Sequence, residues 1–284
     1  MTARGRRLLV RFMTMLVAGL AGLLSVGALP AGADTVGIGQ YVALGDSYAA
    51  GQGGSLAYDN ECLRSPNGYP ALLDAENQIH LRANAACTGA TTSDVAEEQL
   101  SALKQGTRLV TLTVGAADLG LSRVLAACTA GTPAQCQEAI GLADLLLPAE
   151  CGDESELGRR LGNLYADVAE AAPNALIVAT GYPLLFDDPD LLETQINDAT
   201  TRLNCAIDKA VADAQAAGIN IVYVDVTQAF ARHGIGCRCA VPFINPPEAG
   251  INAFHPTPAG YLAYAAAISA ALPNSWGANQ EHVA

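Results

Sequence analysis

The sequence predicts one α/β domain in which helices cover both faces of a parallel β-sheet. Three observations support this fold class: five short apolar segments recur along the chain, each is apolar almost throughout, and helical patterns lie between them. Strands that are buried on both faces have this continuous apolar character. Strands that alternate with helices form right-handed βαβ units. We therefore expect a three-layer α/β/α sandwich.

The strands of this sheet are expected where valine, isoleucine and leucine gather, at residues 41–44, 79–83, 109–114, 175–180 and 219–224. The helices are expected at residues 69–76, 95–104, 157–171, 191–217 and 258–272. Pro258 suits the first turn of the last helix, where a missing N–H costs nothing, and Thr257 suits its N-cap. His255 then lies on the loop that enters this helix.

The first 33 residues have the features of a signal peptide. Four arginines are followed by an apolar run at residues 13–29 and by the small residues 31–33, a pattern that suits signal peptidase. We expect cleavage after Ala33, secretion, and a mature domain at residues 34–284 without a stable membrane anchor. A retained membrane anchor is the alternative, and Arg6 and Arg7 leave the export route open between Sec and Tat. The remaining length suits one large domain.

The composition is acidic, and this restricts the expected partners. The formal net charge is −13, and loss of the four arginines in residues 1–33, a segment without acidic residues, lowers it to −17. Nucleic acids and anionic membrane surfaces repel such a protein on average, so neither is an expected partner. We expect a monomer that acts on a neutral or cationic small molecule.

All eight cysteines lie after the expected cleavage site. An even number in an exported protein favours disulfides. The alternative is a metal site formed by Cys237, Cys239 and His233, although this spacing matches none of the usual zinc patterns. We expect neither a metal nor an organic cofactor.

Residues able to do chemistry follow the ends of several predicted strands. Ser47 comes just after the first strand, a loop with Gly89 follows the second, and residues 115–118 follow the third. The carboxyl ends of parallel strands lie along one edge of a sheet, where ligands bind. A serine is a poor nucleophile until a base takes its proton, and His255 offers an imidazole at this edge. Each motif alone also fits an ordinary turn, so the shared edge carries the argument.

Together these blocks resemble those of the SGNH, or GDSL, hydrolase family, in particular its secreted actinobacterial lipase and esterase branch. The likeness covers essentially the whole mature protein. It implies a flavodoxin-like fold with five strands in the order 2-1-3-4-5, Ser47 in Gly-Asp-Ser as the nucleophile, and His255 in the last block as the base. It also implies that the backbone amides of Ser47 and Gly89 form part of an oxyanion hole.

Two positions depart from the family pattern. Ala117 stands where the family has an asparagine that completes the oxyanion hole, and Asn252 stands where it has the carboxylate that orients the histidine. Loss of an oxyanion donor costs about a hundredfold to a thousandfold in turnover in hydrolases that rely on it. In parts of the resembled branch a backbone carbonyl near position 252 orients the histidine. We therefore expect Asn252 to orient His255 through its own C=O.

The resemblance also implies a disulfide pattern. The implied pairs are Cys62 with Cys87, Cys128 with Cys136, and Cys205 with Cys237 or Cys239, while Cys151 takes the remaining partner. Residues 121–154, which contain three of these cysteines, are expected to form a loop that influences substrate selectivity.

The leading hypothesis is a secreted serine ester hydrolase, a lipase or esterase that forms an acyl-enzyme on Ser47 with His255 as general base. One alternative, motivated by Ala117 and Asn252, is a binding protein that keeps the scaffold with weak or no catalysis. Another is a carbohydrate O-deacetylase, because the same residues serve either kind of ester. The expected substrate is accordingly a small-molecule, lipid or carbohydrate ester.

Overall fold

The computed structural model describes residues 38–273, apart from 56–57, 59–60 and 76–78. The predicted signal peptide and its cleavage site lie outside the described residues. Within the described part of the protein, no helix combines the length and the apolar character that a membrane crossing requires.

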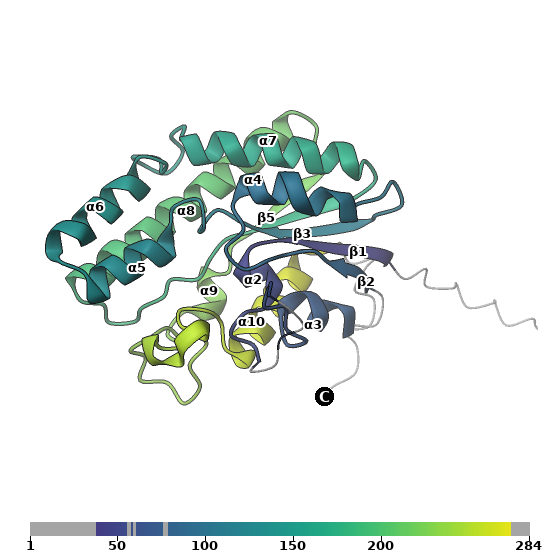
Figure 1. Ribbon diagram of the computed structural model, residues 1–284. Coiled ribbons are helices and arrows are strands. Elements are labelled where there is room, and N and C mark those ends of the chain that lie inside the picture. The colour runs from purple at the N-terminus through teal and green to yellow at the C-terminus, as the bar shows by residue number, and fades with distance from the viewer. Residues whose placement is uncertain (1–37, 56–57, 59–60, 76–78, 274–284) are drawn as a thin grey trace, which may run out of the picture. The chain divides into compact units, whose positions relative to one another are not determined.

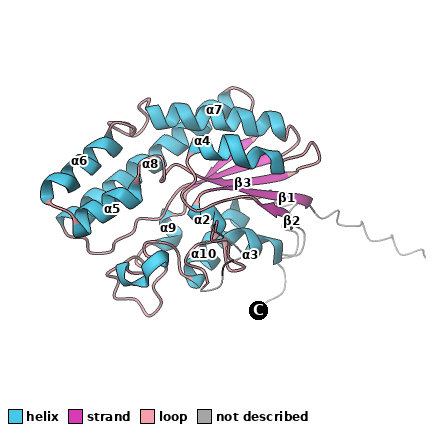
Figure 2. Ribbon diagram, in the orientation of Figure 1, coloured by secondary structure: helices cyan, strands magenta, loops and turns pink. Residues whose placement is uncertain are grey.

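Five parallel strands form the sheet of the described domain (Figures 1 and 2). In sequence order they are β1 Ile38–Gly45, β2 Ile79–Asn84, β3 Leu109–Thr113, β4 Leu176–Thr180 and β5 Ile221–Val224. They pair in the order β2-β1-β3-β4-β5. β3 and β4 are buried over their whole length, as strands covered on both faces should be. The predicted fold class and strand order are confirmed.

Helices cover both faces of this sheet (Figure 1). On one face lie α7 (Glu156–Ala171), α8 (Leu191–Ala216) and α4 (Thr92–Asp94). A π-helical turn and a 3₁₀ turn extend α4 as far as Ala102. On the other face α3 (Tyr69–Ala75) packs against α10 (Pro258–Ala271). α7 shows the pattern behind this arrangement, because its buried residues recur every three or four positions and form one apolar stripe. Each predicted helix overlaps an observed one.

Residues 121–154 do not form the loop that the sequence analysis expects. They contain a helical hairpin of α5 (Leu121–Ala130) and α6 (Pro133–Asp144). Thr132 caps α6, since its hydroxyl accepts the backbone N–H of Gln135, and Pro133 occupies the first turn. These capping residues mark the start of a helix where the sequence prediction has a loop.

Three further short helical segments are absent from the prediction. They are α2 (Ser47–Ala50), α9 (Thr227–Phe230) and the 3₁₀ segment η3 (Pro247–Asn252). Short turns of this kind leave little periodicity in a sequence, because a single turn exposes no repeating apolar face.

Two disulfides are those that the resemblance implies. Cys62 is bonded to Cys87, and Cys128 is bonded to Cys136. The first ties the segment after α2 to the loop after β2. The second closes the hairpin of α5 and α6.

The pairing implied for Cys205 is wrong. Cys205 is bonded to Cys151, because Cys151 shortly precedes α7 and Cys205 lies on α8, which packs beside α7. Cys237 and Cys239 are bonded to each other. Neither sulfur is therefore a free thiolate, which removes the alternative of a metal site with His233.

Candidate active site

Ser47 is the first residue of α2, just after the end of β1. The backbone turns sharply at Gly45, where a Cβ would lie 2.0 Å from the carbonyl oxygen of Thr113 on β3, so only glycine fits. The side chain of Asp46 then caps α2 by accepting the backbone N–H of Tyr48 at 2.9 Å. This turn places Ser47 at the carboxyl edge of the sheet and at a helix N-terminus.

His255 reaches the same place from the far end of the sequence. It lies between η3 and α10, and its Nε2 is 2.8 Å from Oγ of Ser47, although 208 positions separate the two residues. Asn245 holds the loop in place, because its backbone N–H and its side-chain amide both donate to the carbonyl oxygen of His255, at 2.9 and 3.0 Å. The structure thus brings the predicted nucleophile and base into contact.

The second ring nitrogen of His255 determines which nitrogen carries the hydrogen. Nδ1 lies 2.8 Å from the carbonyl oxygen of Ala253, two residues earlier. Because a carbonyl oxygen only accepts, Nδ1 is the protonated nitrogen in this contact, and Nε2 keeps a lone pair for the hydroxyl of Ser47. An imidazole in this tautomer is able to take the serine proton.

Asn252 does not orient His255 in the way that the sequence analysis expects. Its side-chain oxygen accepts a hydrogen bond from the hydroxyl of Tyr58, and its side-chain nitrogen lies 3.5 Å from the carbonyl oxygen of Ser55. Its own C=O accepts the backbone N–H of His255 at 3.2 Å, and it also raises the pKa of the His255 ring, although less than the carbonyl of Ala253 does. The acceptor at Nδ1 belongs to Ala253, so the expectation is wrong by one residue.

Burial lowers the pKa of His255 to about 4, from an ordinary value of 6.5. The charged imidazolium loses solvation in this site, and the groups that contact the ring nitrogens are a neutral carbonyl and a neutral hydroxyl. His255 is therefore uncharged at neutral pH, which is the form that accepts a proton.

Gly89 and Ala117 line the same cavity as Ser47. The backbone N–H of Ser47 is the first of α2, where the helix itself offers no acceptor. Gly89 has a φ of 77°, and a Cβ on it would meet no atom within 4 Å, so it borders open space. Ala117 presents a methyl group where an asparagine would present an amide. Ser47, Gly89 and Ala117 therefore border the same space, and Ala117 brings no side-chain donor to it.

The cavity has a volume of about 390 Å³, and much of its wall is apolar. Leu121, Leu125 and Ala126 come from α5, while Ile251 and Phe254 come from the segment that precedes His255. The α5 helix therefore helps to shape the site, as the selectivity expectation for residues 121–154 requires. Side chains of this kind favour the burial of an apolar part of a ligand.

Comparison with known proteins identifies the family of this chain. Residues 43–263 match the model of the GDSL-like Lipase/Acylhydrolase family. The chain belongs to this family. It is therefore an ester hydrolase of the lipase and esterase class, as the sequence analysis predicts.

Streptomyces proteins are among the similar GDSL-like hydrolases. Lipase 1 of Streptomyces coelicolor is 29% identical over 265 residues, which are 89% of this chain and 93% of that protein. The crystal structure of phospholipase A1 from Streptomyces albidoflavus NA297 has a TM-score of 0.73 and 34% identity, over 82% of this chain and 99% of its own. The crystal structure of the extracellular lipase from Streptomyces rimosus has a TM-score of 0.71 and 30% identity. The match covers 82% of this chain and 100% of that one.

In this GDSL-like hydrolase the aspartate of Gly-Asp-Ser is a buried carboxyl group. Asp46 is 2% exposed, and its Oδ2 accepts a hydrogen bond from the hydroxyl of Tyr182 at 2.6 Å. Burial raises the pKa of Asp46 to about 7. The hydroxyl of Tyr182 also accepts the backbone N–H of Ala116 at 3.3 Å, so it links the turn at Ser47 to the loop that carries Ala117.

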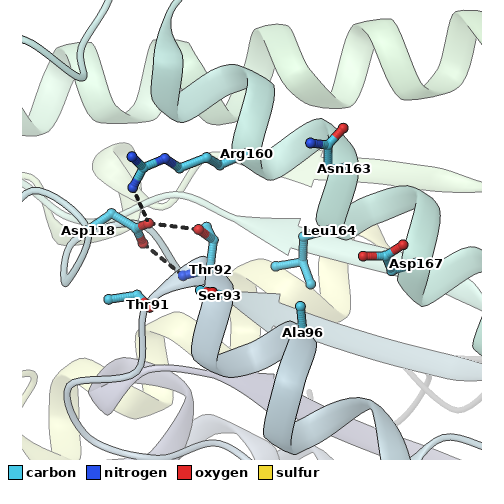
Figure 3. Close-up of a pocket in the computed structure, with 9 residues that line it drawn as sticks. All are labelled: Thr91, Thr92, Ser93, Ala96, Asp118, Arg160, Asn163, Leu164 and Asp167. Atoms are coloured by element: carbon cyan, nitrogen blue, oxygen red, sulfur yellow. Dashed lines mark hydrogen bonds and ion pairs between the residues drawn. The ribbon is translucent and has the colours of Figure 1, made fainter.

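In this GDSL-like hydrolase Asp118 contacts the first residue of α4, Thr92 (Figure 3). Its carboxylate accepts the backbone N–H of Thr92 at 2.9 Å and the hydroxyl of Thr92 at 2.7 Å. Arg160 of α7 approaches the same carboxylate at 3.5 Å. These side chains line a second cavity of about 500 Å³. Asp118 therefore joins the segment after β3 to the start of α4.

Gln52 is a further residue of the site that the sequence analysis missed. Its side chain accepts the hydroxyl of Thr88 at 2.6 Å and donates to the carbonyl oxygen of Ile251. It thereby links the loop of Gly89 to the segment that precedes His255. No sequence signal marks Gln52 or Tyr182, because each acts through a partner that is distant in the sequence.

Proposed function

We propose that this protein is a secreted serine lipase or esterase that forms an acyl-enzyme on Ser47, with His255 as general base. The observation that carries the proposal is the 2.8 Å contact between Nε2 of His255 and Oγ of Ser47, on a cavity with apolar walls. The contact between Nδ1 and Ala253 supports it, because it leaves the lone pair on Nε2.

In the first half of the reaction His255 takes the proton of Ser47 while Oγ attacks the acyl carbon of the ester. The bond from that carbon to the alcohol oxygen breaks, and His255 gives its proton to the leaving alcohol. In the second half water gives a proton to His255 and attacks the acyl-serine. The carboxylic acid leaves, and the proton returns to Oγ of Ser47.

In this proposal the backbone N–H groups of Ser47 and Gly89 stabilise the negative charge that develops on the acyl oxygen. Ala117 contributes no side-chain donor. The carbonyl of Ala253 is neutral, so it steadies the imidazolium less than a carboxylate would. We expect slower turnover than in a hydrolase that has both groups, which is weakened catalysis and not an inactive scaffold.

The cavity wall favours an ester with a longer acyl group over a sugar acetate. An acyl group of several methylenes would bury against Leu125 of α5 and Phe254. An acetyl group offers little apolar surface to such a wall, so a carbohydrate O-deacetylase is the weaker candidate. Nitrophenyl esters of increasing acyl length, compared with an acetylated polysaccharide, separate the two functions.

Export completes the proposal. The four disulfides suit an oxidising compartment, and residues 1–33 have the composition of a signal peptide. The similar lipase of Streptomyces rimosus is described as extracellular. Mass spectrometry of the protein recovered from culture medium tests this point, and an N-terminus at Asp34 is the expected result.

The test of the chemistry uses the purified mature protein, nitrophenyl butyrate and a serine-directed phosphonate. Wild type is expected to turn over the ester and to gain the phosphonate mass on the peptide that contains Ser47. The Ser47→Ala variant is expected to do neither. Equal turnover by wild type and Ser47→Ala, together with an unlabelled Ser47, would refute the proposed function.

A further inference from the structure

The backbone at Phe254 has an unusual conformation. Its φ is 64°, in the left-handed region that bulky side chains rarely adopt. Phe254 lies between Ala253 and His255, and this bend turns the carbonyl of Ala253 back toward the ring of His255, at 2.8 Å from Nδ1. The orientation of the histidine thus depends on a backbone conformation that is unfavourable by itself and needs support from its surroundings.

Tyr48 provides this support through its hydroxyl group. The hydroxyl donates to the carbonyl oxygen of Phe254 at 2.7 Å, and the side chain of Tyr48 is only 4% exposed. Loss of a buried donor leaves its acceptor unsatisfied, so such a bond holds its acceptor firmly. The ring of Tyr48 also lies beside that of His255, with 5.4 Å between their centroids.

The bond between Tyr48 and Phe254 joins the sequence neighbours of the two reacting residues. Tyr48 follows Ser47, and Phe254 precedes His255. The backbone N–H of Tyr48 is itself bonded to Asp46, which fixes it at the start of α2. Asn245 secures the other side of the bend, because its carbonyl oxygen accepts the backbone N–H of Phe254 at 3.0 Å.

We propose that Tyr48 is a positioning residue for the reaction. Its hydroxyl holds Phe254 in the left-handed bend, and the bend directs the carbonyl of Ala253 to Nδ1 of His255. This pair of contacts replaces the carboxylate that a histidine base usually relies on. The proposal rests on the proposed roles of Ser47 and His255.

The first test is the Tyr48→Phe variant, which removes the hydroxyl and keeps the ring. We expect kcat to fall about tenfold, the factor that corresponds to one buried hydrogen bond. KM for nitrophenyl butyrate should stay the same, since the hydroxyl contacts the backbone and not the substrate. A kcat equal to that of wild type would overturn the proposal.

The matched control is Tyr41→Phe. Tyr41 is fully buried on β1, and its hydroxyl is bonded to that of Thr111 at 2.7 Å, away from the loop of His255. This variant loses a comparable buried hydroxyl, so it shows what a purely structural loss does. Its kcat is expected to match that of wild type, and a fall as large as that of Tyr48→Phe would also overturn the proposal.

A double-mutant cycle tests the role of the bend. Asparagine tolerates the left-handed region better than phenylalanine does, so Phe254→Asn reduces the need for support. All four proteins of the cycle are assayed with nitrophenyl acetate, and in the Phe254→Asn background Tyr48→Phe should cost less than about threefold in kcat. The same tenfold loss in both backgrounds would mean that Tyr48 acts by another route.

The outcomes also separate this inference from the proposed function. If Ser47→Ala keeps full activity, the proposed function fails and the positioning role fails with it. If Ser47→Ala is inactive while Tyr48→Phe and Tyr41→Phe both match wild type, only the positioning role of Tyr48 is refuted.

Discussion

The side-chain oxygen of Asn252 accepts a hydrogen bond from the hydroxyl of Tyr58. The same hydroxyl of Tyr58 accepts the backbone N–H of Gly53 at 2.9 Å. Asn252 stands at the place of the family's orienting carboxylate, but its side-chain oxygen is bonded to Tyr58. The group that contacts Nδ1 of His255 is the peptide carbonyl of Ala253.

The Asn252→Ala variant is expected to keep most of its activity. The side chain of Asn252 contacts Tyr58 and Ser55, and the acceptor at Nδ1 of His255 remains in place. We expect kcat for nitrophenyl butyrate to change by less than about threefold. A fall of a hundredfold or more would show that the amide itself aligns the imidazole.

The pH dependence of kcat/KM is expected to follow the lowered pKa of His255. The base works only in its neutral form, so activity is lost as the pH falls through the pKa of the free enzyme, which is about 4. The rate should therefore stay near its plateau at pH 5.5, where an ordinary histidine would already be mostly protonated. Circular dichroism at each pH checks that the fold persists. A midpoint at about pH 6 or above would contradict this expectation.

The Ala117→Asn variant is expected to raise turnover. Position 117 lines the cavity with Ser47 and Gly89, so an amide there would add a third donor to the oxyanion. One such donor is worth up to about a hundredfold to a thousandfold in kcat, and we expect a gain of about tenfold or more. Ala130→Asn on the exposed end of α5 is the matched control. An unchanged rate in a correctly folded Ala117→Asn variant would mean that position 117 no longer faces the oxyanion.

The Asp46→Asn variant is expected to change how stability depends on pH. In the folded protein the pKa of Asp46 is raised to about 7, from 3.8. Between these values the folded state holds a proton that the unfolded state has lost. The contribution of Asp46 to the free energy of unfolding therefore falls as the pH rises, by up to about 1.4 kcal/mol per pH unit. The lowered pKa of His255 acts in the opposite sense between about pH 4 and 6.5 in both proteins, so the test compares the two. In urea titrations, the change in the free energy of unfolding from pH 4.5 to 7 should be less favourable in wild type than in Asp46→Asn.

The fold was largely predictable because each strand and each long helix carries its own local signal. β3 and β4 are buried on both faces and read as continuous apolar runs, and α7 repeats its buried residues every three or four positions. The hairpin of α5 and α6 is absent from the prediction, which treats residues 121–154, with their three cysteines, as a loop. The cap at Thr132 and Pro133 is the signal that would have found α6.

The contact between Ser47 and His255 was predictable because parallel strands collect their carboxyl ends at one edge. The acceptor at Nδ1 was not, because it depends on the φ of Phe254, a conformation that its residue type disfavours. The support from Tyr182 and Gln52 was also not predictable. Each of these side chains meets a partner that only folding brings near it.

Every amino acid carries a peptide carbonyl, whatever its side chain. Since the atom that aligns the imidazole is the one at residue 253, no single codon change can delete it. In an enzyme with a catalytic triad, one missense mutation removes the carboxylate that contacts the histidine. A backbone carbonyl in that role is not removed by a change of side chain. A sequence search that requires Asp or Glu at position 252 would wrongly classify such an enzyme as inactive.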